Sequence, residues 1–363
     1  MSYIPRIAET FATIGFDRDE LSYFARHILL PGIGLNGQKK LKCARVLVVG
    51  AGGLGCPALQ SLAGAGVGAI TILDGDVVEA SNLSRQWLHP FDARGQNKAR
   101  SAQKTLEAGN PFIRVRGRAE MLNADNAGAL VADADLVVDA TDDLEVRYLI
   151  DDVCAEWDRP WVHAALYRES AQISVFWSRY GARFRGLFPA PSEAPSCSGA
   201  GMLGASASLV GNFQALEAIK LITGNGSPGV GQLRTLDTTS ARMETFHLVD
   251  ADLRRFDPPA GTGDAASDTA VTPLALKQSL TIHEPLTLLD LRNDPPDALP
   301  GARSCSEEAL LEDGPPREGE GAGKIVLICE EGALSELLAH ALRPQNPRLY
   351  HLSGGMRAWR ELS

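Results

Sequence analysis

The sequence predicts an α/β protein built from two domains, one large and one small. Residues 46–55 (VLVVGAGGLG) have the pattern of a buried strand that runs into a glycine-rich turn. Residues 257–273 (DPPAGTGDAASDTAVTP) are rich in Pro, Gly, Ala and Asp and lack apolar periodicity, which is typical of a linker. The chain has 363 residues, 44% of them hydrophobic, which is enough for two cores. We therefore expect a first domain over residues 1–256 and a second over residues 274–363.

The glycine-rich turn predicts a Rossmann-like phosphate site in the first domain. Gly50, Gly52 and Gly55 would let the backbone turn tightly and approach an anion. A helix that begins near Leu54 would direct its free N–H groups at that anion. The pattern G-x-G-x-x-G is weak on its own, because glycines also end strands in many ordinary loops.

The next predicted strand indicates a ribonucleotide. Residues 69–73 (AITIL) end at Asp74, which lies about 20 residues beyond the turn, where an acidic side chain can accept the ribose hydroxyls. Segments 74–86 (DGDVVEASNLSRQ) and 95–99 (GQNKA) then add Asn82, Arg85 and Lys98 on the nucleotide side of the sheet. Two cations suit a triphosphate better than a hydride carrier.

A further buried strand, within residues 136–143 (LVVDATDD), ends in Asp142 and Asp143. Carboxylate oxygens are hard ligands, appropriate to a Mg²⁺ ion that bridges phosphates. The alternative interpretation is that these carboxylates only cap the following helix.

Six blocks within residues 22–220 resemble the ThiF/MoeB/HesA family, the bacterial relatives of ubiquitin-activating enzymes. The blocks are SYFARHILLPGIGLNGQKKL, VLVVGAGGLG, DGDVVEASNLSRQ, GQNKA, DATDD and GNFQALEAIKLITG. The resemblance implies a Rossmann-like adenylation domain with a mixed sheet. It also implies the activity: Mg-ATP is used to adenylate the C-terminal Gly-Gly carboxylate of a ubiquitin-like sulfur carrier protein, and pyrophosphate is released.

The same resemblance implies roles for individual residues. It places the nucleotide and its magnesium ion on Gly52 and Gly53, Asp74 (ribose), Asn82, Arg85 and Lys98 (phosphates), and Asp142 (Mg²⁺). Arg26 matches an arginine that in the family reaches across a homodimer interface toward the triphosphate. The alternative for Arg26 is a surface salt bridge.

The six cysteines are few and scattered, so a disulfide framework is not expected. Cys43, Cys56 and Cys154 lie in or beside apolar segments and are predicted to pack as small buried thiols. Cys197, within SCSGAGMLG at 196–204, resembles the crossover-loop cysteine of the family, a thiol that can attack the acyl-adenylate or join a covalent acyl intermediate. A loop thiol without chemistry is the alternative.

No zinc is expected, because the chain departs from relatives that hold zinc with two C-x-x-C pairs. Arg183 and Gly186 occupy the positions of the first pair, and no cysteine occurs between Cys197 and Cys305. Packing by residues 184–188, which include two phenylalanines and a leucine, would then hold this region.

Residues 274–363 resemble a single rhodanese domain. The matching segments are LTLLDLR, ALPGARS, KIVLICEEGALSELLAHAL and YHLSGGMRAW. Strand 324–328 would deliver Cys329 to a short loop whose N–H groups, with the start of a helix at 335–342, surround a thiolate or persulfide. Such an environment lowers a thiol pKa and supports sulfur transfer. A cysteine without function at a strand end is the alternative.

The loop CEEGALS departs from ordinary rhodaneses, because Leu334 stands where the family usually has arginine. Glu330 and Glu331 are expected to add like charge beside the thiolate. Thiosulfate should therefore bind poorly, and a protein persulfide, for example on a cysteine desulfurase, is the favoured donor. A degenerate, structural rhodanese module is the alternative.

Composition limits the remaining possibilities. A formal net charge of −10 argues against general nucleic-acid binding, and no signal peptide or long apolar run is present. We expect a cytoplasmic homodimer without membrane contact. The main hypothesis is a fused sulfur-carrier activating enzyme with Cys329 as sulfur donor. The alternatives are adenylation of a peptide, adenylation of a carrier dedicated to a thio-containing natural product or siderophore, and a scaffold that retains only the fold.

Overall fold

The computed structural model describes residues 2–30, 32–180, 182–189, 201–248, 269–293, 295–312, 314–316, 323–343 and 346–362. Its contacts divide the chain into two units, Met1–Ile14 with Lys39–Ala260, and Gly15–Gln38 with Gly261–Ser363. The segment Gly15–Gln38, which the sequence places in the first domain, thus groups with the second unit. No helix in the described ranges is long and apolar enough to cross a lipid bilayer.

The first unit is built on an eight-stranded sheet with the strand order β3-β2-β1-β4-β5-β6-β7-β8. The first five strands are parallel and the last three are antiparallel, so the predicted α/β class and mixed sheet are confirmed. The strands are β1 (Arg45–Val49), β2 (Ala69–Leu73), β3 (Arg114–Arg118), β4 (Leu136–Asp139), β5 (Trp161–Tyr167), β6 (Ser170–Phe176), β7 (Gln232–Asp237) and β8 (Arg242–His247).

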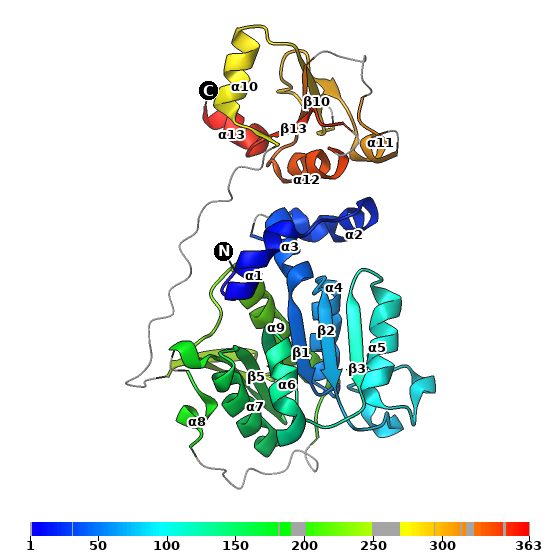
Figure 1. Ribbon diagram of the computed structural model, residues 1–363, viewed down its shortest axis with the longest axis vertical. Helices are drawn as coiled ribbons and strands as arrows, with labels where there is room; N and C mark the ends of the chain where they lie inside the picture. Colours follow the sequence, from blue (N-terminus) through cyan, green and yellow to red (C-terminus); the bar gives the residue numbers. More distant parts are fainter. Residues whose placement is uncertain are drawn as a thin grey trace. The chain divides into compact units, whose positions relative to one another are not determined.

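Helices cover both faces of this sheet (Figure 1). Successive side chains of β1 alternate between two cores: Val46 and Val48 pack with α4, α5 and α9, whereas Leu47 and Val49 pack with α6 and α7. A strand buried on both faces is therefore apolar throughout. The helices of the first unit are α1 (Pro5–Thr10), α4 (Gly55–Gly64), α5 (Lys98–Gly109), α6 (Ala124–Asp133), α7 (Leu144–Glu156), α8 (Phe184–Leu187) and α9 (Gly204–Thr223).

The N-terminal part of the second unit contains helix α2 (Arg18–Ile28), and α3 (Gly34–Cys43) joins the two units along the chain. Helix α2 begins with a capping box, in which Asp17 accepts from the Glu20 N–H group and Glu20 accepts from the Asp17 N–H group.

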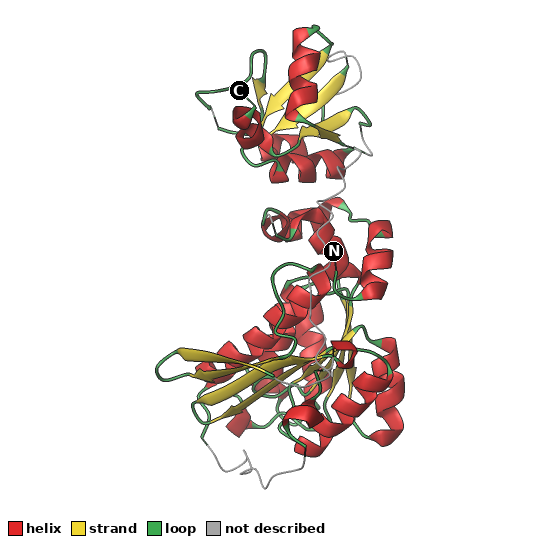
Figure 2. Cartoon of the chain, turned by 90° about the vertical axis from the view of Figure 1, so that its left-hand side faces the viewer, coloured by secondary structure: helices red, strands yellow, loops and turns green. Residues whose placement is uncertain are grey.

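The C-terminal part of the second unit is built on a five-stranded parallel sheet with the order β11-β10-β12-β13-β9. Ile325 and Leu327 of β12 pack with α11 and α12, while Val326 and Ile328 pack with α10 and α13. Figure 2 shows strands and helices of both units in contrasting colours. The elements are β9 (Ala270–Val271), α10 (Pro273–Thr281), β10 (Leu286–Asp290), β11 (Arg303–Ser304), α11 (Glu307–Glu312), β12 (Lys324–Ile328), α12 (Ala333–Leu342), β13 (Leu349–Leu352) and α13 (Gly355–Glu361).

Candidate functional site

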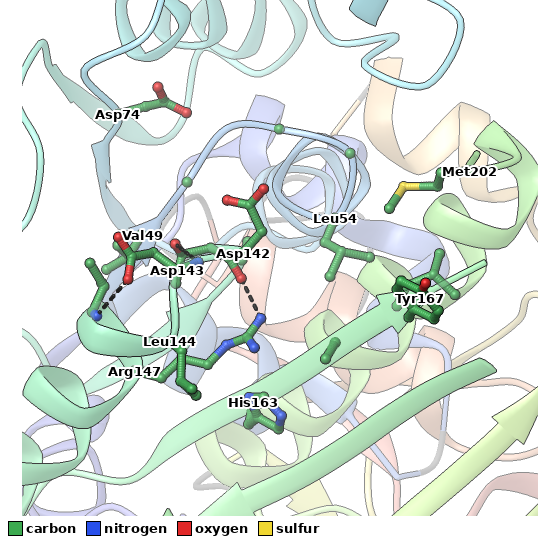
Figure 3. Close-up of a pocket in the computed structure, with 18 of the residues that line it drawn as sticks. Val49, Leu54, Asp74, Asp142, Asp143, Leu144, Arg147, His163, Tyr167 and Met202 are labelled. Carbon is green, nitrogen blue, oxygen red and sulfur yellow. Dashed lines mark hydrogen bonds between the residues drawn. The ribbon is translucent and has the colours of Figure 1, made fainter. Parts of the chain in front are cut away.

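A cavity of about 1000 Å³ opens in the first unit, where β1, β2 and β4 end (Figure 3). In α/β sheets, ligands bind at the carboxyl ends of the parallel strands. The cavity gathers most of the nucleotide residues expected from the sequence, which are Gly50, Gly52, Gly53, Asp74, Asn82, Arg85, Lys98 and Asp142. Gly55 does not line it.

The glycine-rich turn is as tight as its sequence predicts. Gly50 has a φ of +99°, and a Cβ there would lie 2.7 Å from the carbonyl oxygen of Ala140. A Cβ on Gly55 would lie 2.1 Å from the Gly50 carbonyl oxygen, so Gly55 allows α4 to start against the turn. Leu54 precedes α4 without a side-chain cap, which leaves the first N–H groups of this helix without a side-chain partner.

Buried side chains hold the peptide groups of Ala51, the second residue of the turn. The carboxylate of Asp74 accepts hydrogen bonds from the N–H groups of Ala51 (2.7 Å) and Asp76 (2.8 Å). His89 Nε2 lies 2.9 Å from the Ala51 carbonyl oxygen, and its Nδ1 lies 3.1 Å from Ser101 Oγ. Burial lowers the pKa of His89, which favours the neutral ring. Asp74 therefore shapes the turn directly, and contact with a ribose stays a prediction.

Two cations face the same end of the cavity, and each is held by a neighbouring side chain. Arg85 Nη2 donates to Asn82 Oδ1 at 2.7 Å, and Lys98 Nζ pairs with Asp76 Oδ2 at 2.9 Å. Lys98 is almost completely buried, whereas Asp76 is exposed. Low solvent access strengthens the attraction of such cations for a phosphate.

Asp142 and Asp143, neighbours in the chain, have different surroundings. Asp143 Oδ1 accepts from the N–H groups of Glu145 (2.8 Å) and Val146 (3.2 Å), so it caps α7. The capping alternative is thus confirmed for Asp143. The Asp142 carboxylate is exposed and makes no hydrogen bond with any residue that the structure describes.

The Asp142 carboxylate fits the way proteins usually hold Mg²⁺, through one or two carboxylates together with substrate phosphates. Across the described part of the chain, no group of three or more His, Cys, Asp or Glu side chains could hold a metal ion by itself.

A buried polar cluster behind Asp142 was missed by the sequence analysis. Asp139, which is fully buried, accepts from the Thr141 N–H group (3.1 Å) and from Arg147 Nε (3.2 Å), and it contacts His163 Nδ1 (3.1 Å). Arg147 also donates to the Thr141 carbonyl oxygen at 2.6 Å (Figure 3). These bonds fix the turn that carries Asp142. Burial lowers the pKa of His163, so the ring is neutral and donates to Asp139.

One face of the β5–β6 hairpin also lines the cavity. Ala165 pairs with Gln172 and Tyr167 with Ser170, and all four residues border the cavity. Facing residues of an antiparallel pair project from the same side of a sheet. Pockets for single small molecules span about 300–1000 Å³, so this cavity lies at the upper end of that range.

Aromatic packing, a hydrogen bond and an ion pair all contribute to the region around α8. Phe184 is buried against Tyr148 and Trp161, and the Tyr148 hydroxyl donates to the Phe188 carbonyl oxygen at 2.8 Å. Arg183, which the family resemblance aligns with a cysteine position, pairs with Asp151 at 3.0 Å.

The cysteine predictions have mixed outcomes. Cys56 and Cys154 are buried as predicted, and burial raises the pKa of Cys56 to about 12. Cys43 is only half-buried, because it contacts Arg6 and Thr10 at the edge of its core. Cys197 lies outside the described residues.

Arg26 is exposed on α2 and does not line the cavity. Its role across a dimer interface stays a prediction.

Cys329 lies at the end of β12 in the loop that the sequence predicts. Its Sγ atom accepts from the N–H groups of Gly332 (3.1 Å) and Ser335 (3.4 Å) and lies 3.2 Å from Ser335 Oγ. The thiol is 6% exposed. A Cβ on Gly355 would lie 2.5 Å from the Cys329 carbonyl oxygen, so α13 packs directly on the loop. Two convergent N–H donors suit a thiolate or persulfide.

Glu330 and Glu331 follow Cys329 in the loop, and the structure adds that both are paired. Glu330 accepts from Arg360 Nη2 at 3.1 Å and from Arg292 Nη1 at 3.3 Å, while Glu331 pairs with Arg357 at 3.3 Å. These guanidinium groups offset part of the negative charge, and the effect of the two carboxylates on the thiolate stays a prediction. The hydrogen bond from Arg360 lowers the pKa of Glu330, which keeps it ionised.

Known proteins resemble the chain in both sequence and fold. The ThiF family model matches residues 24–254. "Probable adenylyltransferase/sulfurtransferase MoeZ" of Mycobacterium tuberculosis (strain ATCC 25618 / H37Rv) is 36% identical, over 98% of this chain and 96% of that protein. "Adenylyltransferase and sulfurtransferase MOCS3-2" of Zea mays is 34% identical, over 98% of this chain and 82% of that protein.

Solved structures agree on the fold. The chain matches PaaA with a TM-score of 0.57 at 23% identity, over 66% of this chain and 77% of that one. It matches Escherichia coli MccB with ATP with a TM-score of 0.53 at 19% identity, over 67% of this chain and 82% of that one. The family model covers more than half of the chain, and relatives align with nearly its whole length. The chain therefore belongs to the ThiF family.

Proposed function

We propose that the chain uses Mg-ATP to adenylate the C-terminal Gly-Gly carboxylate of a ubiquitin-like sulfur carrier protein and then passes sulfur to it from a Cys329 persulfide, forming a thiocarboxylate. The observation that carries this proposal is the single cavity that joins a glycine turn, two cations and an available carboxylate. The names of the full-length relatives, which combine adenylyltransferase and sulfurtransferase, support both halves.

In the first step, a carboxylate oxygen of the carrier attacks the α-phosphorus of ATP, and the bond to the β-phosphate oxygen breaks. The attack brings two anions together, so positive charge must offset their repulsion and the charge that develops on pyrophosphate. Arg85 and Lys98 supply that charge from the chain, and Asp142 would hold the magnesium ion. No nucleophilic side chain is needed, and the hairpin face of β5 and β6 has room for the carrier tail.

In the second step, the terminal sulfur of the Cys329 persulfide attacks the acyl carbon of the adenylate, and AMP leaves. The product is an acyl disulfide between the carrier and Cys329. A second thiol then attacks the Cys329 sulfur and releases the thiocarboxylate, and an external thiol reductant reopens the disulfide that remains on Cys329. By resemblance, Cys197 is a thiol that can attack the acyl-adenylate or join a covalent acyl intermediate.

We further propose the partners and organisation that the sequence predicts. A cysteine desulfurase supplies the persulfide, the chain works as a cytoplasmic homodimer, and no zinc, membrane or nucleic acid takes part. Residues 1–256 form the adenylation domain and residues 274–363 the rhodanese-like domain, joined by the linker at 257–273.

Exchange of labelled pyrophosphate into ATP, with a panel of Gly-Gly carriers, tests adenylation. A matched Cys329→Ala chain should keep carrier-dependent exchange and lose thiocarboxylate formation, which mass spectrometry of the carrier reports. If no carrier supports pyrophosphate exchange although the chain binds ATP, a peptide substrate or a scaffold role would be favoured. An unchanged thiocarboxylate yield from Cys329→Ala would remove Cys329 as the donor.

A further inference from the structure

A network of ion pairs borders the Cys329 loop; we call it the loop ion network. It consists of Asp290, Arg292, Asp297, Glu330 and Arg360. Arg292 contacts all three carboxylates, at 2.8 Å (Asp290), 2.9 Å (Asp297) and 3.3 Å (Glu330). Arg360 joins Asp297 at 2.8 Å and Glu330 at 3.1 Å. Every residue of the network belongs to the second unit.

Backbone geometry, rather than Glu330 alone, brings both arginines to the loop. Strand β10 pairs with β12, and the Leu291 N–H group donates to the Ile328 carbonyl oxygen at 2.8 Å, so Arg292 follows directly beside the loop. Helix α13 starts on the loop, where the Met356 N–H group donates to the Cys329 carbonyl oxygen at 3.0 Å. Both guanidinium groups would therefore stay near the loop if Glu330 lost its charge.

Glu330 changes the charge that a sulfur donor meets. It follows Cys329 directly in the chain, and its carboxylate bridges the two guanidinium groups. The network has three carboxylates against two guanidinium groups, which leaves one net negative charge. Arg292 is only 11% exposed and already fully paired. Leu334 packs against the core of the second unit and offers no charge. A dianion such as thiosulfate therefore finds no available cation among these residues.

We propose that Glu330 determines the sulfur donor: by bridging Arg292 and Arg360 it excludes small dianionic donors, and Cys329 accepts sulfur from a cysteine persulfide presented by another protein. In that transfer the Cys329 thiolate attacks the outer sulfur, the sulfur–sulfur bond of the donor breaks, and the donor cysteine leaves as a thiolate. This inference rests on the proposed function, in which Cys329 carries sulfur. Glu330 is a specificity-determining residue here and takes no part in bond making.

Thiosulfate provides the sharpest probe because its reaction is simple. The Cys329 thiolate attacks the outer sulfur of thiosulfate, the sulfur–sulfur bond breaks, and sulfite leaves with the electron pair. Cyanide then removes the transferred sulfur as thiocyanate and regenerates the thiolate. Thiocyanate formation therefore reports how well an anionic donor reaches Cys329.

The first experiment compares Glu330→Gln with Glu331→Gln in the full chain. Both variants remove one carboxylate from the same loop, but Glu331 pairs only with the exposed Arg357. We expect Glu330→Gln to lower the KM for thiosulfate about tenfold, since a dianion near a unit charge is strongly affected even with salt screening. Glu331→Gln should change the KM less than about twofold, because an exposed pair is well screened. Equal effects of both variants, or no effect of Glu330→Gln, would overturn the proposal.

A second measurement needs no variant. If net negative charge excludes thiosulfate, added potassium chloride should lower the KM of the unaltered chain, because salt screens repulsion. A KM that rises with salt would indicate attraction and would also overturn the proposal.

An alkyl persulfide, which carries at most one negative charge, separates this inference from the proposed function. Sulfur gain on Cys329, measured by mass spectrometry, should be equal in the unaltered chain and in Glu330→Gln. If Cys329 gains no sulfur from any donor, the proposed function fails. If Cys329 gains sulfur from the alkyl persulfide but the KM for thiosulfate is the same in the unaltered chain and in Glu330→Gln, only the role of Glu330 is overturned.

Discussion

At the scale of single residues, the two neighbouring aspartates after β4 give the clearest functional contrast. Asp142 has an exposed carboxylate that faces the cavity, while Asp143 caps α7. We expect Asp142→Ala to lower carrier-dependent pyrophosphate exchange on the order of 100-fold, because one electrostatic contribution to the transition state is lost. The unfolding temperature should stay within the error of the unaltered chain.

Asp143→Ala is the matched control for this prediction. Loss of the helix cap should lower the free energy of unfolding by about 1 kcal/mol, while exchange stays within about twofold. Calorimetry and exchange on both variants separate the two effects. If Asp143→Ala lost exchange as strongly as Asp142→Ala, the division of roles between the two residues would be wrong.

The sequence predicted most of the cavity residues but not the hydrogen bonds and ion pairs between them. The spacing of Asp74, Asn82, Arg85 and Lys98 after known strand patterns was sufficient to bring them together. Asp139 and His163 were not predicted, because they lie on separate strands and only the register of β4 and β5 brings them together. Asp139 opens the DATDD block, where attention fell on Asp142 and Asp143, and His163 has no local motif. The pairing of Glu330 escaped for the same reason, because its partners are distant in sequence.

At the scale of elements, the start of α4 depends on a glycine without access to the cavity. A Cβ on Gly55 would overlap the Gly50 carbonyl oxygen, whereas a Cβ on Gly64 at the other end of α4 meets nothing within 4 Å. We expect Gly55→Ala to cost about 1–3 kcal/mol of stability and to raise the KM for ATP. Gly64→Ala should raise the free energy of unfolding by up to about 1 kcal/mol and leave the KM for ATP unchanged. Denaturant unfolding and exchange kinetics provide the comparison, and an unchanged KM in Gly55→Ala would contradict it.

Strand β13 should make the second unit sensitive to acid. Burial lowers the pKa of His351 to about 4, whereas the unfolded value is about 6.5. As the pH falls from about 6.5 to 4, the unfolded chain therefore takes up a proton first, and stability decreases by up to about 3 kcal/mol. Above pH 6.5 this contribution does not vary.

Hydrogen exchange of the peptide covering β12 and β13, corrected for intrinsic rates, measures this loss. His351→Gln should reduce the change in stability of the second unit between pH 6.5 and 4. His283→Gln, at an exposed position of the same unit, should leave it unchanged. A steep loss that persists in His351→Gln would assign the effect to other groups.

Elements with a simple pattern were predicted best. The strands expected at 69–73 and 324–328 coincide with β2 and β12, because most residues of a buried parallel strand are apolar. The helix expected at 335–342 begins two residues earlier, at Ala333, since Gly332 in the left-handed region precedes it. The hairpin face that lines the cavity was not predicted, because its small and polar side chains alternate with buried ones and carry no motif.

At the scale of the whole molecule, Arg26 raises the question of whether one chain or two chains form a complete adenylation site. It is exposed on α2, which groups with the second unit, yet the family resemblance has it act on the cavity of a partner chain. An isologous dimer has two equivalent sites, so each site would combine Asp142 of one chain with Arg26 of the other. Arg26→Ala and Asp142→Ala should each strongly lower exchange when both chains of the dimer carry the substitution.

Mixed dimers, purified through two different tags after co-expression, distinguish the arrangements. If Arg26 acts in the partner, an Arg26→Ala chain paired with an Asp142→Ala chain has one complete site and should show about half of the normal exchange per dimer. An unaltered chain paired with a chain carrying both substitutions should then be inactive, because its intact Asp142 meets no Arg26. If Arg26 serves its own chain, the two results exchange places. Inactivity of both mixed dimers would leave Arg26 as a structural residue, and full activity of the Arg26→Ala homodimer would remove it from the site altogether.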